Sequence, residues 1–136
     1  MLPYNLDHVG IAVRDLDASL DRYRVLYGAE PLYRAVVPEQ GVEEAMVPVG
    51  GSFVQLLQPL GSDTPVGRFI ERRGEGLHHV AFAVADIEAA LDRLREEGAS
   101  LVDEVPRQGG RGARIAFVHP REFAGTLVEL VELSAT

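Results

Sequence analysis

Two histidines lie in stretches of nearly the same pattern, and their imidazoles are the first candidates for chemistry. His8 lies in residues 6–13, and His79 lies in residues 77–84. Both stretches alternate in the way expected of strands, whose side chains point to opposite faces in turn. The residues that follow each histidine on its face are small, Gly10 and Ala12 after His8 and Ala81 and Ala83 after His79, so we expect both imidazoles to point into open space.

The two stretches are copies of one another. A shift of 71 positions, from Leu6 to Leu77, superimposes identical residues over one strand and the helix after it. The matching residues of the first copy are Leu6, His8, Val9, Ala12, Val13, Asp15, Ala18, Leu20, Asp21, Arg22 and Arg24. Only two copies fit the chain, which indicates a duplicated half-domain rather than a solenoid. Residues 51–56 also align with residues 125–130, and this places Gln55 opposite Glu129.

The duplication therefore gives two matched pairs of potential metal ligands, His8 with His79 and Gln55 with Glu129. If the copies pair about a pseudo-twofold axis, the four side chains converge. Two imidazoles, one carboxylate and one amide oxygen suit a divalent metal ion such as Co, Mn, Ni, Fe or Zn. A single carboxylate leaves the ion with net charge and open positions, which favours a catalytic metal over a structural one.

Taken singly, these residues favour a plainer interpretation, because a lone strand histidine is more often packed or solvated than a metal ligand. The matching of the two pairs is what favours the metal site. His78 falls on the packing face of its strand, and His119 precedes Pro120 in a turn. We interpret His78 as structural. His119 is either structural or at the mouth of the pocket, and we favour the structural role.

Glu44 is the candidate catalytic base. It alternates with Val42 and Met46, so we expect it on the apolar face of its strand, where a carboxylate can act on a carbon acid. Its neighbour Glu43 falls on the other face. The plainer interpretation of both glutamates is a charged, exposed strand that is protected against edge pairing.

The composition excludes several classes of function. The net charge is −8 and all 13 basic residues are arginine, so no basic stripe is available for nucleic acid. The lack of cysteine and lysine removes thiolate nucleophiles, disulfides and Schiff-base chemistry. No apolar run is long enough to span a membrane, and the start is unlike a signal peptide. We expect a cytoplasmic protein without nucleic-acid or membrane partners.

Periodicity and turn residues predict the order βαβββ in both copies. In module one, about residues 4–59, a helix is predicted at 15–27 and the later strands at 30–37, 42–47 and 52–57. A connector, residues 60–75, contains a short helix that begins at Thr64-Pro65. In module two, about residues 76–134, a helix is predicted at 86–97, a glycine-rich loop at 106–112, and strands at 77–84, 99–105, 113–118 and 126–133. We predict a single α+β domain, residues 1–136, with a curved, mostly antiparallel sheet around the metal site.

Two βαβββ modules with His8, Gln55, His79 and Glu129 at these places resemble the vicinal oxygen chelate superfamily of glyoxalases, bleomycin resistance proteins and dioxygenases. Within it, the chain resembles the epimerases that act on methylmalonyl-CoA. The segments that carry this resemblance are 8–16, 38–42, 64–69, 74–82, 116–120 and 127–130, and the run Gly-Glu-Gly-Leu-His-His at 74–79 is fairly specific to these epimerases. The loop 121–125 departs from the pattern, which has a serine or histidine near the substrate.

The resemblance implies interconversion of the two C2 epimers of methylmalonyl-CoA by a homodimer. It places the divalent metal ion on His8, Gln55, His79 and Glu129, the same residues as the matched pairs. Glu44 and Glu129 are the two carboxylates expected to move the C2 proton, and arginines and backbone amides must meet the phosphates of CoA. The alternatives are a glyoxalase-type isomerase, a ring-cleaving dioxygenase that would leave Gln55 without a role, and a metal-free binding or resistance protein.

Overall fold

The structure is a computed structural model that describes residues 3–134. It contains two compact units, one formed by residues 8–78 and the other by residues 79–134 together with the short segment 3–7. Each unit holds most of one predicted module. No helix in the described part of the chain is long and apolar enough to cross a lipid bilayer.

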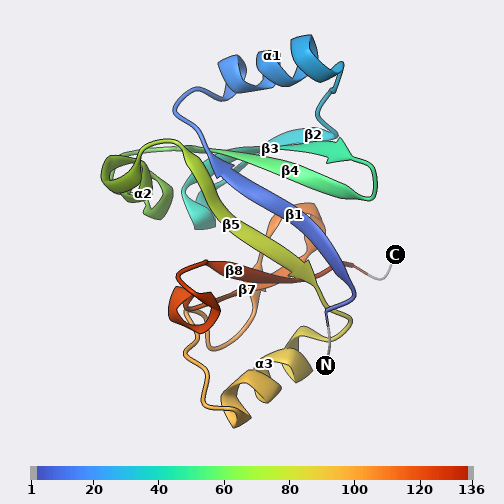
Figure 1. Ribbon diagram of the computed structural model, residues 1–136, viewed down its shortest axis with the longest axis vertical. Coiled ribbons are helices and arrows are strands. Elements are labelled where there is room, and N and C mark those ends of the chain that lie inside the picture. The colour runs from blue at the N-terminus through green and yellow to red at the C-terminus, as the bar shows by residue number, and fades with distance from the viewer. Residues whose placement is uncertain (1–2, 135–136) are drawn as a thin grey trace. The chain divides into compact units, whose positions relative to one another are not determined.

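Module one has the predicted order of elements (Figure 1). They are β1 (Asn5–Ala12), α1 (Leu16–Tyr27), β2 (Tyr33–Val37), a 3₁₀ turn η1 (Pro38–Gln40), β3 (Val42–Val49) and β4 (Ser52–Pro59). The strands lie in the order β2-β3-β4-β1, with β1 parallel to β4 and the other neighbours antiparallel. This register sets Gln55 of β4 between Gly10 of β1 and Met46 of β3.

Helix α1 covers one face of these strands because its apolar residues lie on one side of it (Figure 1). The Asp15 side chain accepts a hydrogen bond from the Ala18 N–H at 3.0 Å and caps the helix start. Gly28 ends the helix in the left-handed conformation, with φ of 65°. Leu16 and Leu20 are buried in a core that also contains Val13, Ala45, Val47 and Leu56. The alternate side chains of the strands point away from α1, and we call the surface they form the inner face of module one.

Helix α2 (Pro65–Arg73) covers one end of this inner face. It begins as predicted, because the Thr64 hydroxyl accepts a hydrogen bond from the Gly67 N–H at 3.1 Å and Pro65 occupies the first turn. Val66 and Ile70 are buried against residues of the inner face, which are Ala12, Val37, Val42 and Leu57.

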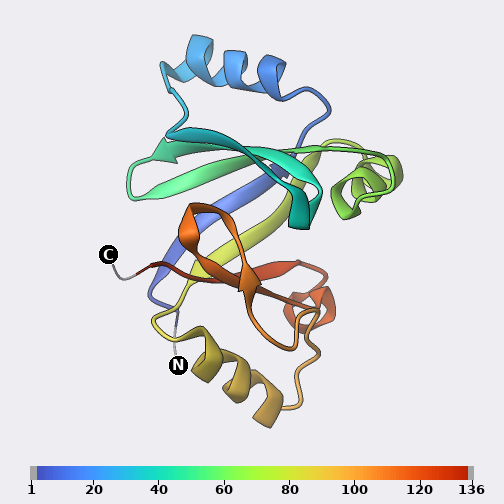
Figure 2. The same cartoon turned by 180° about the vertical axis from the view of Figure 1, so that it is seen from behind.

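Module two repeats the order, and the three strands after its first one are shorter than their counterparts in module one. Its elements are β5 (Gly76–Ala83), α3 (Ile87–Glu96), β6 (Arg107–Gln108), a 3₁₀ turn η2 (Gly110–Gly112), β7 (Arg114–Val118), a 3₁₀ turn η3 (Pro120–Phe123) and β8 (Val128–Glu132). The strand order is β5-β8-β7-β6, with β5 parallel to β8 and the other neighbours antiparallel. Figure 2 shows the orange β6–β7 hairpin beside the red β8. Ile87 and Leu91 of α3 pack on one face of these strands, and the other face is the inner face of module two.

The predicted strand at 99–105 is wrong. Within this stretch only Leu101 forms an isolated bridge, and the edge strand of the module is β6, which lies in the predicted glycine-rich loop. The cause is a side chain that competes with the strand ladder. The Asp103 carboxylate accepts a hydrogen bond from the Phe117 N–H at 2.9 Å. The N–H groups of Val102 and Asp103 both donate to the Phe117 carbonyl, so consecutive residues share one acceptor instead of alternating as they do in a strand.

The predicted fold class is confirmed. The chain is α+β, and both modules have the order βαβββ with two antiparallel strand pairings and one parallel pairing. The other predicted elements agree with the structure within a few residues, β2 beginning at Tyr33 rather than at position 30.

Replacing Gly67 by alanine is expected to destabilise the protein, although alanine is the better helix former. A Cβ at this position would lie 2.3 Å from the backbone carbonyl oxygen of Gly61. Overpacking of this kind costs about 1–3 kcal/mol, whereas alanine gains only about 1 kcal/mol over glycine within a helix. Urea denaturation measures the difference in the free energy of unfolding.

Gly51→Ala is the matched control, because a Cβ there meets no described heavy atom within 4 Å. It is expected to stay within about 0.5 kcal/mol of the unchanged protein. Equal stability of the two variants would contradict the close approach of α2 to Gly61.

Candidate active site

The inner face of module one carries four polar side chains, one on each of its strands. They are His8 on β1, Tyr33 on β2, Glu44 on β3 and Gln55 on β4. His8, Glu44 and Gln55 are 3%, 1% and 7% exposed, and Tyr33 is half-buried. Buried polar groups are unfavourable unless they find partners. Their hydrogen bonds therefore show which polar atoms on this face have partners and which could bind a ligand.

Glu44 is the centre of this group. Its Oε2 accepts a hydrogen bond from the Tyr33 hydroxyl at 2.5 Å, and its Oε1 accepts one from Gln55 Nε2 at 3.0 Å. As predicted, Glu44 lies on the same face of its strand as the buried Val42 and Met46. Its neighbour Glu43 points the other way and forms an ion pair with Arg34 at 2.8 Å.

The Gln55 amide is the part of this network with an unused hydrogen-bonding atom. Its nitrogen faces Glu44 because a carboxylate accepts hydrogen bonds and an amide oxygen cannot donate them. Gln55 Oε1 is buried and has no hydrogen-bond partner among residues 3–134. A buried acceptor without a hydrogen bond lowers the free energy of unfolding. An amide oxygen is also a ligand that hard and borderline divalent cations accept. The residues present therefore fit a metal ion at this oxygen.

The inner face of module two pairs an imidazole with a carboxylate. His79 of β5 and Glu129 of β8 are 3% and 4% exposed, and His79 Nε2 lies 3.0 Å from Glu129 Oε1. Phe117 of β7 meets the His79 ring edge to face, with the ring centroids 5.5 Å apart. Both members of the pair are of residue types that bind borderline divalent metals.

The strand registers confirm the alignment of Gln55 with Glu129. Gly10 of β1 lies opposite Gln55, and Ala81 of β5 lies opposite Glu129. Positions 10 and 81 differ by the same 71 residues that relate the two copies. Each module therefore buries one histidine and one oxygen donor at equivalent places on its inner face.

The other two histidines have structural contacts, as predicted. The His78 ring is half-buried and packs edge to face on Phe69 of α2, with centroids 4.8 Å apart. His119 is exposed, and its Nδ1 accepts a hydrogen bond from the Arg121 N–H at 3.1 Å at the start of η3.

Tyr33 was not among the predicted site residues, although the sequence contains a signal for it. Tyr33 alternates with Ala35 and Val37, and Val37 is joined to β3 by a short turn. In an antiparallel hairpin this spacing puts Tyr33 on the same face as Glu44. A tyrosine whose hydroxyl is half-buried usually finds a hydrogen-bond partner, so the pair was open to prediction.

A buried ion pair in the compact unit formed by residues 79–134 and 3–7 was also not predicted. Arg111 Nη2 lies 2.5 Å from Asp7 Oδ2, and Asp7 is 4% exposed. Arg111 has a positive φ of 58° between two glycines. The pair ties the glycine-rich loop to the start of β1, which is a structural role.

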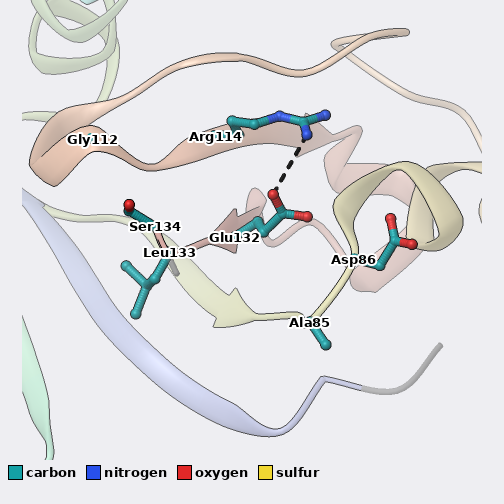
Figure 3. A pocket seen from close by; sticks show the side chains of 7 residues that line it. All are labelled: Ala85, Asp86, Gly112, Arg114, Glu132, Leu133 and Ser134. Carbon is teal, nitrogen blue, oxygen red and sulfur yellow. Dashed lines mark hydrogen bonds and ion pairs between the residues drawn. The ribbon is translucent and has the colours of Figure 1, made fainter. Parts of the chain in front are cut away.

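Module two also has an open pocket, which lies on the other face of its strands (Figure 3). Glu132 lines it, and because Glu132 follows Glu129 by three positions on β8 their side chains point to opposite faces. Glu132 Oε1 lies 3.5 Å from Arg114 Nη1, and Glu132 Oε2 accepts a hydrogen bond from the Ile87 N–H at 2.9 Å. The full lining is Ala85, Asp86, Gly112, Arg114, Glu132, Leu133 and Ser134. This pocket is not part of the candidate active site.

Comparison with known proteins places the chain in a large family. The sequence pattern of the glyoxalase/bleomycin resistance protein/dioxygenase superfamily matches residues 7–117. Among curated relatives, the ethylmalonyl-CoA/methylmalonyl-CoA epimerase of Cereibacter sphaeroides is 39% identical, and the alignment covers 94% of this chain and 97% of that protein. The lactoylglutathione lyase of Arabidopsis thaliana is more distant, at 26% identity over 95% of this chain and 44% of the lyase.

Solved structures of methylmalonyl-CoA epimerases are also similar to this chain. A variant of the Streptomyces coelicolor methylmalonyl-CoA epimerase, in complex with 2-nitronate-propionyl-CoA, has a TM-score of 0.95 and 41% identity, over 99% of this chain and 98% of that chain. A methylmalonyl-CoA epimerase in complex with methylmalonyl-CoA and NH4+ also has a TM-score of 0.95 and 41% identity, over 98% and 97% of the two chains.

Proposed function

This chain belongs to the glyoxalase/bleomycin resistance protein/dioxygenase superfamily, and we propose that within it the protein is an enzyme that interconverts the two C2 epimers of methylmalonyl-CoA. The observation that carries this proposal is the similarity to epimerases of this substrate over nearly the whole chain, at 39% and 41% identity. The buried carboxylate of Glu44 supports it, because epimerisation needs a base held away from water.

The difficulty of the reaction is the loss of a proton from carbon. The C2 atom lies between a thioester and a carboxylate, and when its proton leaves, negative charge develops on their oxygens. An enzyme must place positive charge or hydrogen-bond donors beside those oxygens. It must also place a base on one face of C2 and an acid on the opposite face, because the proton returns from the other side.

We assign a divalent metal ion to the matched ligand pairs, His8 with Gln55 and His79 with Glu129. The support is the burial of all four side chains, their equivalent positions in the two modules, and the unpartnered Gln55 Oε1. When bound, the ion supplies Lewis acidity at the substrate oxygens that become negative. The donor set suits Co, Mn, Ni, Zn or Fe.

Glu44 takes the C2 proton on one face. It is suited to this role because it is buried and is not among the four proposed ligands. We assign the opposite face to Glu129, the carboxylate on the inner face of module two. Coordination lowers the basicity of a carboxylate, so this second assignment requires that Glu129 bind the ion loosely while substrate is present.

The rival functions are less well supported. A glyoxalase-type isomerase would use a similar ligand set, but the lyase relative is only 26% identical and more than twice as long as the matched region. A ring-cleaving dioxygenase needs two histidines and one glutamate, which gives Gln55 no role. A metal-free binding protein has no need for Gln55 Oε1 to stay without a donor.

Proton NMR of methylmalonyl-CoA in heavy water separates these functions. With the protein and metal present, the C2 proton signal is expected to disappear as deuterium replaces it during epimerisation. Persistence of that signal would exclude the epimerase. We further propose a cytoplasmic homodimer, for which light scattering of the purified protein is the test of the oligomeric state.

His79→Ala is expected to remove bound metal, because it deletes one imidazole ligand. Loss of a ligand should lower metal affinity by more than the roughly 10- to 100-fold that supporting residues contribute. His78→Ala is the matched control, since His78 packs on Phe69 and should lose stability but keep the metal. Elemental analysis after dialysis measures both, and equal metal contents would rule out the assignment.

Gln55→Glu is expected to bind metal more tightly but to be less stable without it. The new carboxylate adds attraction to the ion. In the metal-free protein it lies where Gln55 Nε2 is now, 3.0 Å from Glu44 Oε1, and the two like charges repel. Calorimetric metal titration and thermal unfolding with and without metal measure the two effects. Weaker metal binding than in the unchanged protein would show that Gln55 is not a ligand.

Glu44→Gln is expected to lower kcat by roughly 10² to 10⁴-fold with little change in KM, because the amide keeps the shape but cannot accept the proton. Metal content should be unchanged. Exchange of the C2 proton with heavy water, followed on each epimer separately, should slow far more for one epimer than for the other. Turnover close to that of the unchanged protein would show that Glu44 is not the base and has a purely structural role.

A further inference from the structure

The strand register places one hydrogen-bond donor on either side of Glu44. Ala35 of β2 and Leu57 of β4 lie directly opposite it. Tyr33 and Gln55 are two positions away on those same strands, so they are diagonal neighbours of Glu44 on the same face. Long side chains reach across such a diagonal, and both of these do.

Each of the two donors bonds a different oxygen of the Glu44 carboxylate. Tyr33 donates to Oε2 at 2.5 Å and Gln55 donates to Oε1 at 3.0 Å. Each oxygen therefore keeps a further lone pair that can accept a proton. A carboxylate held at both oxygens cannot turn about its terminal torsion without breaking a hydrogen bond. Glu44 is 1% exposed, so water does not readily replace such a bond.

We infer that Tyr33 is a positioning residue for Glu44, and this inference rests on the proposed function, in which Glu44 is a base. A free glutamate side chain has many rotamers, and a base that must meet one C–H bond loses rate when it samples the others. Tyr33 and Gln55 hold it from two strands. Gln55 is also assigned to the metal ion, so its replacement changes two things at once. Tyr33 has no assigned ligand role, and its hydroxyl isolates the positioning effect.

The inference predicts an effect on one face of the substrate only. Glu44 serves a single face of C2, so a loosened Glu44 slows the proton that Glu44 handles. A general loss of structure would slow both epimers alike. Separate exchange rates for the two epimers therefore distinguish positioning from folding.

The experiment compares Tyr33→Phe with Tyr23→Phe, each carrying the metal. Tyr23 is a half-buried tyrosine of α1 that packs on the other face of the strands, so its replacement removes a hydroxyl outside the site. Tyr33→Phe is expected to lower kcat by about 10- to 100-fold, because the rate loss should match the free energy of one hydrogen bond to a charged group. KM should stay within about twofold of its value in the unchanged protein. The loss should appear in heavy-water exchange of one epimer, the same one that Glu44→Gln slows. Tyr23→Phe should leave both rates unchanged.

The double variant gives a second readout. Because Tyr33 acts through Glu44, adding Tyr33→Phe to Glu44→Gln should change the rate by no more than about twofold. Equal slowing of both epimers, multiplied losses in the double variant, or an unchanged rate in Tyr33→Phe would overturn the inference while the proposed function stands. If the unchanged protein exchanges no C2 proton, the proposed function fails and the inference fails with it.

Discussion

The burial of the Glu44 carboxylate is the constraint around which module one is arranged. A charged group that is 1% exposed is costly unless hydrogen bonds replace the water it has lost. Here the replacements come from β2 and β4, the neighbours of β3 on either side, through Tyr33 and Gln55. All three strands must therefore keep their register. A slip of one residue would turn these side chains to the face that packs on α1.

The same constraint explains why one face of the strands packs in the core while the other face carries the polar site residues. The outer face is apolar and packs on α1, with Leu16 fully buried there. The inner face is free to hold polar groups because α2 seals one end of it with Val66 and Ile70. Stability and chemistry thus lie on opposite sides of one sheet, and the alternation of strand side chains separates them.

Duplication gave the two modules the same scaffold but not the same chemistry. Met46 lies opposite Gln55 in module one, and Phe117 lies opposite Glu129 in module two. Two positions earlier, module one has Glu44 where module two has Ile115, which is 3% exposed. Each module therefore has one histidine and one oxygen donor, but at the equivalent positions 44 and 115 only module one has a carboxylate.

Much of this was accessible from the sequence alone. The alternation of side chains predicted which face of its strand carries each of His8, His79 and Glu44, and the repeat predicted the equivalence of Gln55 and Glu129. The expectation that both imidazoles point into open space was wrong, because His8 and His79 are each 3% exposed. These are local or periodic properties, and caps such as Asp15 and Thr64 mark the helix starts in the same local way. The tertiary structure decided the rest. The bond from the Phe117 N–H to Asp103, 14 positions away, ended the predicted strand at 99–105, and the hydroxyl of Tyr33 met Glu44 across two strands. The orientation of the Gln55 amide was set by the same carboxylate. Such contacts depend on which side chains meet once the strands are paired, and no window of sequence contains both partners together with the register that joins them.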